Sequence, residues 1–168
     1  MFRTNNEIPM PSFSPVRIPT RGLPWFKKIL ASFSRRRWKM DHDYYLFLPW
    51  LQKTIMIPKD FVFDGASVPR IFWPIIDPVG VLLIGSLFHD FGYGYNHFLD
   101  ESGKIIYEGA GRSFFDDQIR KINIYINEPV ILNDIVWFVL VLFGWITWNT
   151  RRKTKRNVYQ DFPDLVKN

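Results

Sequence analysis

The segment VGVLLIGSLFHDFG, residues 79–92, determines how the rest of the chain is interpreted. Its apolar residues are spread around the whole circumference of a helix instead of along one stripe. A helix of this composition is buried, so we expect it at the centre of the fold, ending at Gly92 and Gly94. His89 and Asp90 interrupt the apolar pattern near its C-terminal end, which makes them the first candidates for a polar site.

The residues before this central helix have the composition of β-strands. Residues 44–48 and 53–57 are rich in aromatic and β-branched side chains, and a turn separates them. Residues 61–63 form a third short extended piece, and Ser67 is positioned to cap a short helix. The pattern predicts a small antiparallel sheet.

Two further helices are expected after the central one, over residues 110–124 and 129–149. A polar loop, residues 96–108, precedes them and has the signature of a small hairpin. The last helix carries a stripe that should pack on the central helix, with Gly144 allowing close approach: Trp137, Val141, Gly144, Trp145 and Trp148. We therefore expect Trp145 to be buried, and its truncation to alanine to cost about 3–5 kcal/mol.

The apolar run of this last helix, residues 135–146, is too short to cross a membrane. Its length as a helix is about 18 Å, whereas the hydrocarbon core of a bilayer is about 30 Å thick. We expect no membrane span.

The fold class that follows is α+β, a small antiparallel sheet packed on about three helices, with an extended N-terminal arm. Residues 1–24 contain five prolines, which disfavour helix and predict extended chain, and residues 25–38 have the spacing of a basic amphipathic helix. We divide the chain into this arm with its amphipathic segment (1–40), a core domain (41–149) and a basic tail (150–168).

The charge of the chain is concentrated at its ends. The 168 residues carry a net charge of +6 and include no cysteine, which excludes disulfides, thiolate nucleophiles and cysteine-ligated metals. Residues 1–40 have nine Lys or Arg against one acidic residue, and residues 150–168 have six against two. Basic ends predict contact with a polyanion or an acidic protein surface, although solvated tails have the same composition.

Three motifs place polar residues among apolar elements. Asp64 follows the third extended piece, His89 lies in the central helix, and Asp116 lies on the next helix. Because buried polar groups need partners, we expect these three side chains to converge, and such a set of ligands suits Zn²⁺, Mn²⁺ or Fe²⁺. Asp90 would orient His89 or act as base toward a metal-bound water, and Tyr93 is the second catalytic candidate.

Each of these residues also has a purely structural interpretation. Asp64 with Gly65 is a common turn pair, and Arg112 and Asp116 have the i, i+4 spacing of a helix ion pair. His89 could equally hydrogen-bond a carbonyl in the core. The residues alone leave both interpretations open.

Three stretches carry a family resemblance: residues 57–69 (IPKDFVFDGASVP), residues 87–93 (LFHDFGY), and Arg112 with Asp116. At these motifs the chain resembles domain-of-unknown-function family 1353, whose members occur mainly in tailed bacteriophages and prophages. The resemblance covers about residues 44–148, and Asp60 and Phe63 stand where the family pattern has glycine and threonine. It implies a phage origin and a polar site, and no reaction.

On this basis we expect a bacteriophage virion structural or assembly protein of the tail, neck or baseplate region. It would be found in the virion and, before assembly, in the host cytoplasm, with residues 1–40 contacting other virion proteins. Two alternatives remain open. One is a metal-dependent hydrolase acting on the cell wall, and the other is an internal nucleic-acid-associated virion protein that uses the two basic ends.

Overall fold

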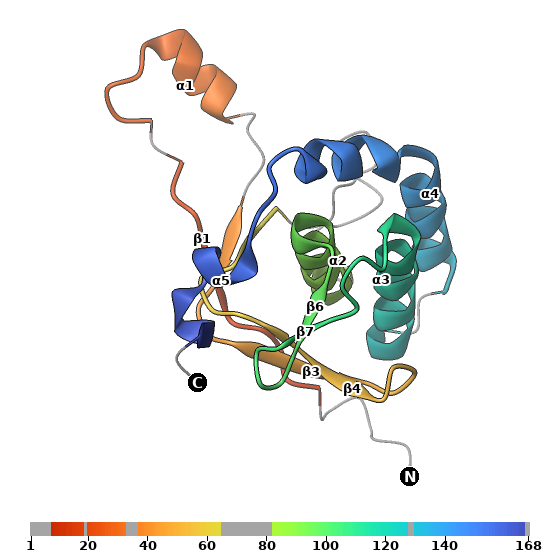
Figure 1. Ribbon diagram of the computed structural model, residues 1–168. Coiled ribbons are helices and arrows are strands. Elements are labelled where there is room, and N and C mark those ends of the chain that lie inside the picture. The colour runs from red at the N-terminus through yellow and green to blue at the C-terminus, as the bar shows by residue number, and fades with distance from the viewer. Residues whose placement is uncertain (1–7, 19, 33–36, 65–81, 128–129, 167–168) are drawn as a thin grey trace.

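The computed structural model describes residues 8–18, 20–32, 37–64, 82–127 and 130–166. Two small antiparallel sheets and a set of packed helices make up this part of the chain, which confirms the α+β class (Figure 1). The short helix expected at Ser67 lies outside the described residues.

One sheet has four strands in the order β3-β4-β6-β7. They are β3 (Tyr44–Leu48), β4 (Lys53–Ile57), β6 (Phe98–Asp100) and β7 (Ile105–Ile106). Tyr44 pairs with Ile57 and Leu48 with Lys53, so the two strands expected from the sequence are confirmed as an antiparallel hairpin. In β3 the buried residues alternate with the exposed Tyr45 and Phe47, as a strand with one face on the core requires.

The expected hairpin between the helices is also confirmed, because β6 pairs with β7. Its turn is held by the side chain of Asp100, which accepts hydrogen bonds from the backbone N–H groups of Ser102 and Lys104 at 2.9 and 3.0 Å. Gly103 in this turn has a φ of 78°, a conformation that favours glycine.

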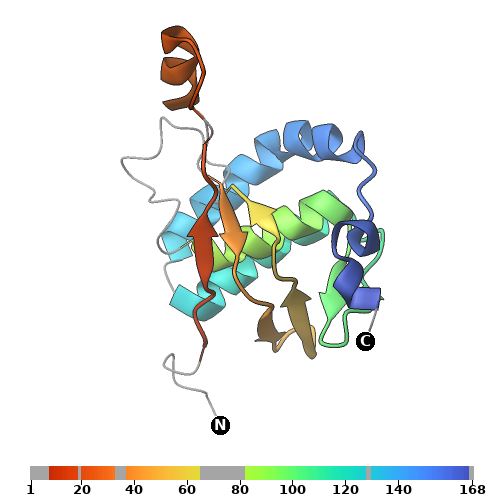
Figure 2. The same cartoon turned by 90° about the vertical axis from the view of Figure 1, so that its left-hand side faces the viewer.

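The other sheet has three strands, β1 (Phe13–Pro15), β2 (Trp38–Met40) and β5 (Val62–Phe63), with β2 in the middle. Strand β5 confirms the third extended piece. Figure 2 shows β1 beside β2, so part of the N-terminal region is a strand of a sheet.

Helix α1 (Trp25–Ser32) confirms the start of the amphipathic segment and projects away from the rest of the molecule in both ribbon views. The helix expected over residues 25–38 is wrong at its C-terminal end, since Trp38 belongs to β2. The backbone hydrogen bonds that β1 and β5 offer to β2 outweigh a helical pattern there.

Helix α2 (Leu83–Tyr95) is the centre of the fold, and all thirteen of its residues are buried. The prediction of a central buried helix is thereby confirmed. Its expected end at Gly92 and Gly94 is wrong, because the helix includes both glycines and continues to Tyr95, where Asn96, with a φ of 61°, caps it. Gly92 instead permits close packing, since a Cβ atom there would lie 2.1 Å from the ring of Phe115.

Helix α3 (Arg112–Asn127) packs on α2, and helix α4 (Val130–Arg152) packs on both. The core-facing line of α4 runs through Asn133, Val136, Leu140 and Gly144, all buried. A short helix α5 (Val158–Asp161) and a 3₁₀ turn (Pro163–Val166) complete the chain.

The expectation that the tryptophan stripe of α4 is buried is wrong for two of its three members. Trp137 is 37% exposed and Trp145 is 54% exposed, whereas the ring of Trp148 lies 5.1 Å from that of Tyr93. Gly144 faces the core, and Trp145 is therefore rotated about 100° away from it. Within the described ranges, no helix combines the length and the hydropathy needed to cross a bilayer.

Candidate functional site

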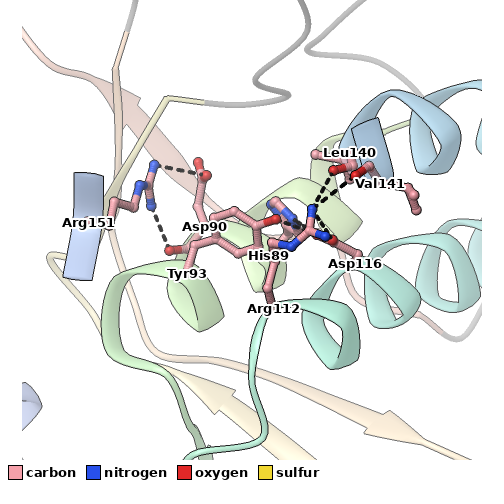
Figure 3. A network of polar contacts seen from close by, with 8 residues as sticks. All are labelled: His89, Asp90, Tyr93, Arg112, Asp116, Leu140, Val141 and Arg151. Atoms are coloured by element: carbon pink, nitrogen blue, oxygen red, sulfur yellow. Dashed lines mark hydrogen bonds and ion pairs between the residues drawn. The ribbon is translucent and has the colours of Figure 1, made fainter. Parts of the chain in front are cut away.

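The best-defined polar cluster joins His89, Tyr93 and Asp116. His89 and Tyr93 lie one turn apart on α2, and Asp116 lies on the facing side of α3 (Figure 3). The Tyr93 hydroxyl donates to Asp116 Oδ1 at 2.5 Å, and His89 Nε2 lies 3.0 Å from the same oxygen. All three residues are at most 4% exposed, so the carboxylate serves two partners inside the core.

Arg112 extends this cluster to α4. Its Nη1 atom lies 3.6 Å from Asp116 Oδ2 and donates to the backbone carbonyls of Leu140 and Val141 at 3.0 and 3.2 Å. These carbonyls are accessible because Gly144 lets α4 approach closely: a Cβ atom at Gly144 would lie 2.6 Å from the Tyr93 hydroxyl. The network therefore connects α2, α3 and α4.

A second cluster lies beside the first and contains Asp90, Asp64 and Arg151. Arg151, near the end of α4, donates to the backbone carbonyl of Asp90 at 2.8 Å and to its carboxylate at 3.1 Å. Its Nη2 atom is also 3.5 Å from Asp64 Oδ1, and the Asp64 N–H donates to Asp90 Oδ2 at 3.2 Å. This cluster attaches β5 and the end of α4 to the central helix.

Burial governs protonation in both clusters. It lowers the pKa of the His89 imidazole below its usual 6.5, and Asp116 opposes that shift, so the buried ring is neutral near pH 7. Burial also raises the pKa of the Asp90 carboxyl well above its usual range, against the effect of Arg151. The pKa of Tyr93 is raised by burial and by its hydrogen bond to Asp116, so the phenol keeps its proton.

The structure brings together some of the residues expected to bind metal. His89 and Asp116 are in direct contact, whereas the contacts of Asp64 given above are with Asp90 and Arg151. In the described part of the chain, no three His, Cys, Asp or Glu side chains are grouped so as to hold a metal ion. Asp90 and Tyr93, the catalytic candidates, fall into different clusters, and their roles stay predictions.

Arg151 is the residue of the site that sequence reasoning missed, because it was assigned to a basic tail. The ring of Trp148, which packs on Tyr93, and Arg152, whose Nη2 donates to the Tyr93 carbonyl, complete the surroundings. One signal was available in the sequence. A buried Asp90 requires a cation, and residues 151–153 form a basic run directly after the longest apolar helix.

A comparison with protein-family models finds one described as "Protein of unknown function (DUF1353)", which matches residues 38–124. The match spans just over half of the 168 residues and includes both clusters except for Arg151. No curated protein and no solved structure matches the chain.

Proposed function

The chain belongs to the DUF1353 family, whose description assigns no activity, and we propose that it is a bacteriophage virion structural or assembly protein. In this proposal it joins neighbouring subunits of the tail, neck or baseplate region through the outer face of α4. The observation that carries the proposal is the amount of apolar surface on that face.

The outer face of α4 is unusually apolar for a surface helix. Between Asp134 and Arg151 the helix contains no charged residue. Large side chains along this stretch are about half exposed: Ile135 45%, Phe138 56%, Leu142 45%, Phe143 57%, Trp145 54% and Ile146 51%. Contiguous exposed apolar surface of this kind marks an interaction site.

The spacing on this face favours another helix as the partner. Ile131, Ile135, Phe138, Leu142, Trp145 and Asn149 follow one another at intervals of four, three, four, three and four residues, and all are exposed. This is the repeat by which helices pair along a common seam, and a single polar Asn within such a seam sets the register of identical helices. The first partner to test is therefore a second copy of the chain.

The buried clusters support a structural role as well. Arg112 holds the backbone of α4 at Leu140 and Val141, and Arg151 holds its C-terminal end. Both anchors lie on the inner side of α4, so the apolar face is presented on a helix fixed at two points. A fixed helix loses less conformational entropy on binding than a mobile one.

Sedimentation velocity of the full-length protein tests this use of α4. The wild-type chain should associate with increasing concentration, and Phe138→Glu should abolish the association because it places a charge in the middle of the seam. Val166→Glu is the matched control, since Val166 is 67% exposed and lies outside α4, in the 3₁₀ turn near the C-terminus. A wild-type protein that stays monomeric and binds no particle protein would contradict the proposal.

The virion role has a separate test. Peptides of this chain should be detected by mass spectrometry in purified particles of the phage that encodes it, at a stoichiometry that persists through density-gradient purification. Detection only in the lysate, with none in the particles, would exclude a virion component.

A metal-dependent hydrolase is the second candidate, and His89 favours it, since this buried imidazole contacts a carboxylate and its lowered pKa is a frequent property of catalytic groups. The assay is release of soluble fragments from purified cell wall with Zn²⁺ or Mn²⁺ added. This candidate requires cleavage that His89→Gln abolishes, and wild-type protein inactive with both metals would exclude it under these conditions.

A further inference from the structure

A hollow of about 380 Å³ lies between the end of α2, strand β5 and the turn that follows α4. Its lining combines three arginines with one carboxylate, one hydroxyl and an apolar wall: Arg37, Arg151, Arg156, Asp64, Thr154, Gly94, Val62 and Phe63. Neither buried cluster accounts for this concentration of positive charge. Arg37 and Arg156 take no part in those clusters.

The three arginines come from the two basic ends of the chain. Arg37 immediately precedes β2, Arg151 is near the end of α4, and Arg156 lies in the segment before α5. Nearly 115 residues separate the first from the second, so only the fold brings them to one hollow. Residues from two charge runs that are separate in the sequence therefore line one hollow.

Two of these guanidinium groups are held in position by neighbouring side chains. Arg151 is fixed by the Asp90 carboxylate and carbonyl at 3.1 and 2.8 Å. Arg156 donates through Nε and Nη2 to Asp161 at 2.9 and 2.8 Å, and its guanidinium lies 4.7 Å from the ring centroid of Tyr95. Its Nη1 atom remains beside Gly94, 3.8 Å from where a Cβ atom would lie.

Arg37 is exposed, and its side chain makes no ion pair with another described residue. Arginines bond two carbonyls in the last turns of α2, which would otherwise repel an anion: Arg151 bonds that of Asp90, and Arg152 bonds that of Tyr93. The lining residues include three arginines and the carboxylate of Asp64. Two of the arginines also contact an aspartate outside the lining, Arg151 with Asp90 and Arg156 with Asp161, so Arg37 is the arginine whose charge is not offset.

We propose that this hollow binds a phosphate group. Arginine presents a planar fork of N–H donors that matches phosphate oxygens, and it stays charged at neutral pH. Arg37, whose charge no acidic side chain among the described residues offsets, would supply the net attraction for the anion. The volume exceeds that of phosphate alone, and Val62 and Phe63 supply an apolar wall, so a nucleotide's phosphate and free phosphate are both admissible sources.

The experiment is a binding titration of the full-length protein at low ionic strength with two probes, inorganic phosphate and a fluorescein-labelled oligothymidylate. Arg37→Gln should weaken binding about tenfold, as expected for a lost hydrogen bond between charged groups. Lys53→Gln is the matched control, since it removes the same charge from an exposed position outside the hollow and should leave affinity unchanged.

The two probes distinguish the source of the phosphate. Saturable binding of inorganic phosphate that Arg37→Gln weakens supports a site for the free ion, and an effect seen only with the oligonucleotide supports a nucleotide. Binding that falls equally in Arg37→Gln and Lys53→Gln reports net charge alone and overturns the proposal, as does a lack of saturable binding by both probes.

Circular dichroism verifies the fold of each variant. If Arg37→Gln does not fold, the test is made on the wild-type protein instead, by measuring phosphate-induced shifts of its arginine Nε–H resonances in NMR spectra. Shifts confined to Arg37, Arg151 and Arg156 support the site, and shifts elsewhere or none overturn it. The result is independent of the assembly proposal, because none of these residues lies on the outer face of α4.

Discussion

Replacing Asp116 by asparagine tests whether the buried network holds the three central helices together. The substitution keeps the shape of the side chain and removes its charge. Oδ1 of Asp116 accepts from Tyr93 at 2.5 Å and lies 3.0 Å from His89 Nε2, and Oδ2 lies 3.6 Å from Arg112. All of these interactions involve the negative charge.

The expected loss follows from the number of these contacts. A hydrogen bond to a charged group contributes about 1.5–3 kcal/mol net, against about 1 kcal/mol for a neutral pair, so two weakened bonds cost roughly 1–2 kcal/mol or more. The amide of the introduced asparagine would also turn a donor toward Arg112. We expect the free energy of unfolding to fall by about 2–3 kcal/mol in Asp116→Asn, and by about 3–5 kcal/mol in Asp116→Ala, which leaves both donors buried without an acceptor.

The adjacent residue is a matched control. Asp117 is 40% exposed and pairs with Lys121 at 2.6 Å across one turn of α3, an exposed ion pair. Asp117→Asn should therefore change stability by about 0.5 kcal/mol or less. Urea unfolding followed by circular dichroism measures both variants, and equal losses for Asp116→Asn and Asp117→Asn would refute the assignment of the network to the stability of the core.

Three further predictions concern α4 and the buried histidine. Trp148→Ala should lower the free energy of unfolding by about 3 kcal/mol, and Trp145→Ala by less than about 1 kcal/mol, since Trp148 packs on Tyr93 whereas Trp145 is 54% exposed; similar losses in thermal melts would contradict this difference. Gly144→Ala should destabilise the protein by about 1–3 kcal/mol, because the added Cβ atom meets the Tyr93 hydroxyl at 2.6 Å, and an unchanged urea midpoint would show that α4 can shift without cost. The lowered pKa of His89 means that, as the pH falls, the unfolded chain takes up a proton at this residue before the folded chain does. The free energy of unfolding should therefore be highest above about pH 6.5 and should decrease below that pH. His89→Asn should reduce this decrease, and a variant with the same pH profile as wild type would assign the decrease to other groups.

The local sequence pattern was sufficient to predict those helices and strands whose burial follows from their own residues. The uniformly apolar α2 and the aromatic-rich β3 were predicted with their approximate bounds, because a helix apolar on all sides must be buried and aromatic side chains favour a strand. His89 and Asp116 were predicted as partners for the same reason, since polar groups within such elements need one another.

The orientation of α4 and the long-range ion pairs depended on which helices and strands pack against each other, and no local sequence pattern contains that information. The tryptophan stripe of α4 is compatible with several rotations of the helix about its axis. The rotation observed is the one that places Gly144 against Tyr93 and lets Arg112 reach the backbone of α4, and it leaves Trp145 outside.

The pairing of Asp90 with Arg151 is a further example. The two residues are 61 positions apart, and nothing in the sequence distinguishes Arg151 from the other cations of the basic tail as the partner of Asp90. The sequence by itself determined that α2 would be buried, that polar residues within it would need partners, and that both ends of the chain would be basic. Only the tertiary structure decided which cation Asp90 would meet and that Arg37 and Arg156 would share a hollow, because long-range contacts depend on the packing of whole helices and strands, whereas burial of an apolar segment depends on the segment alone.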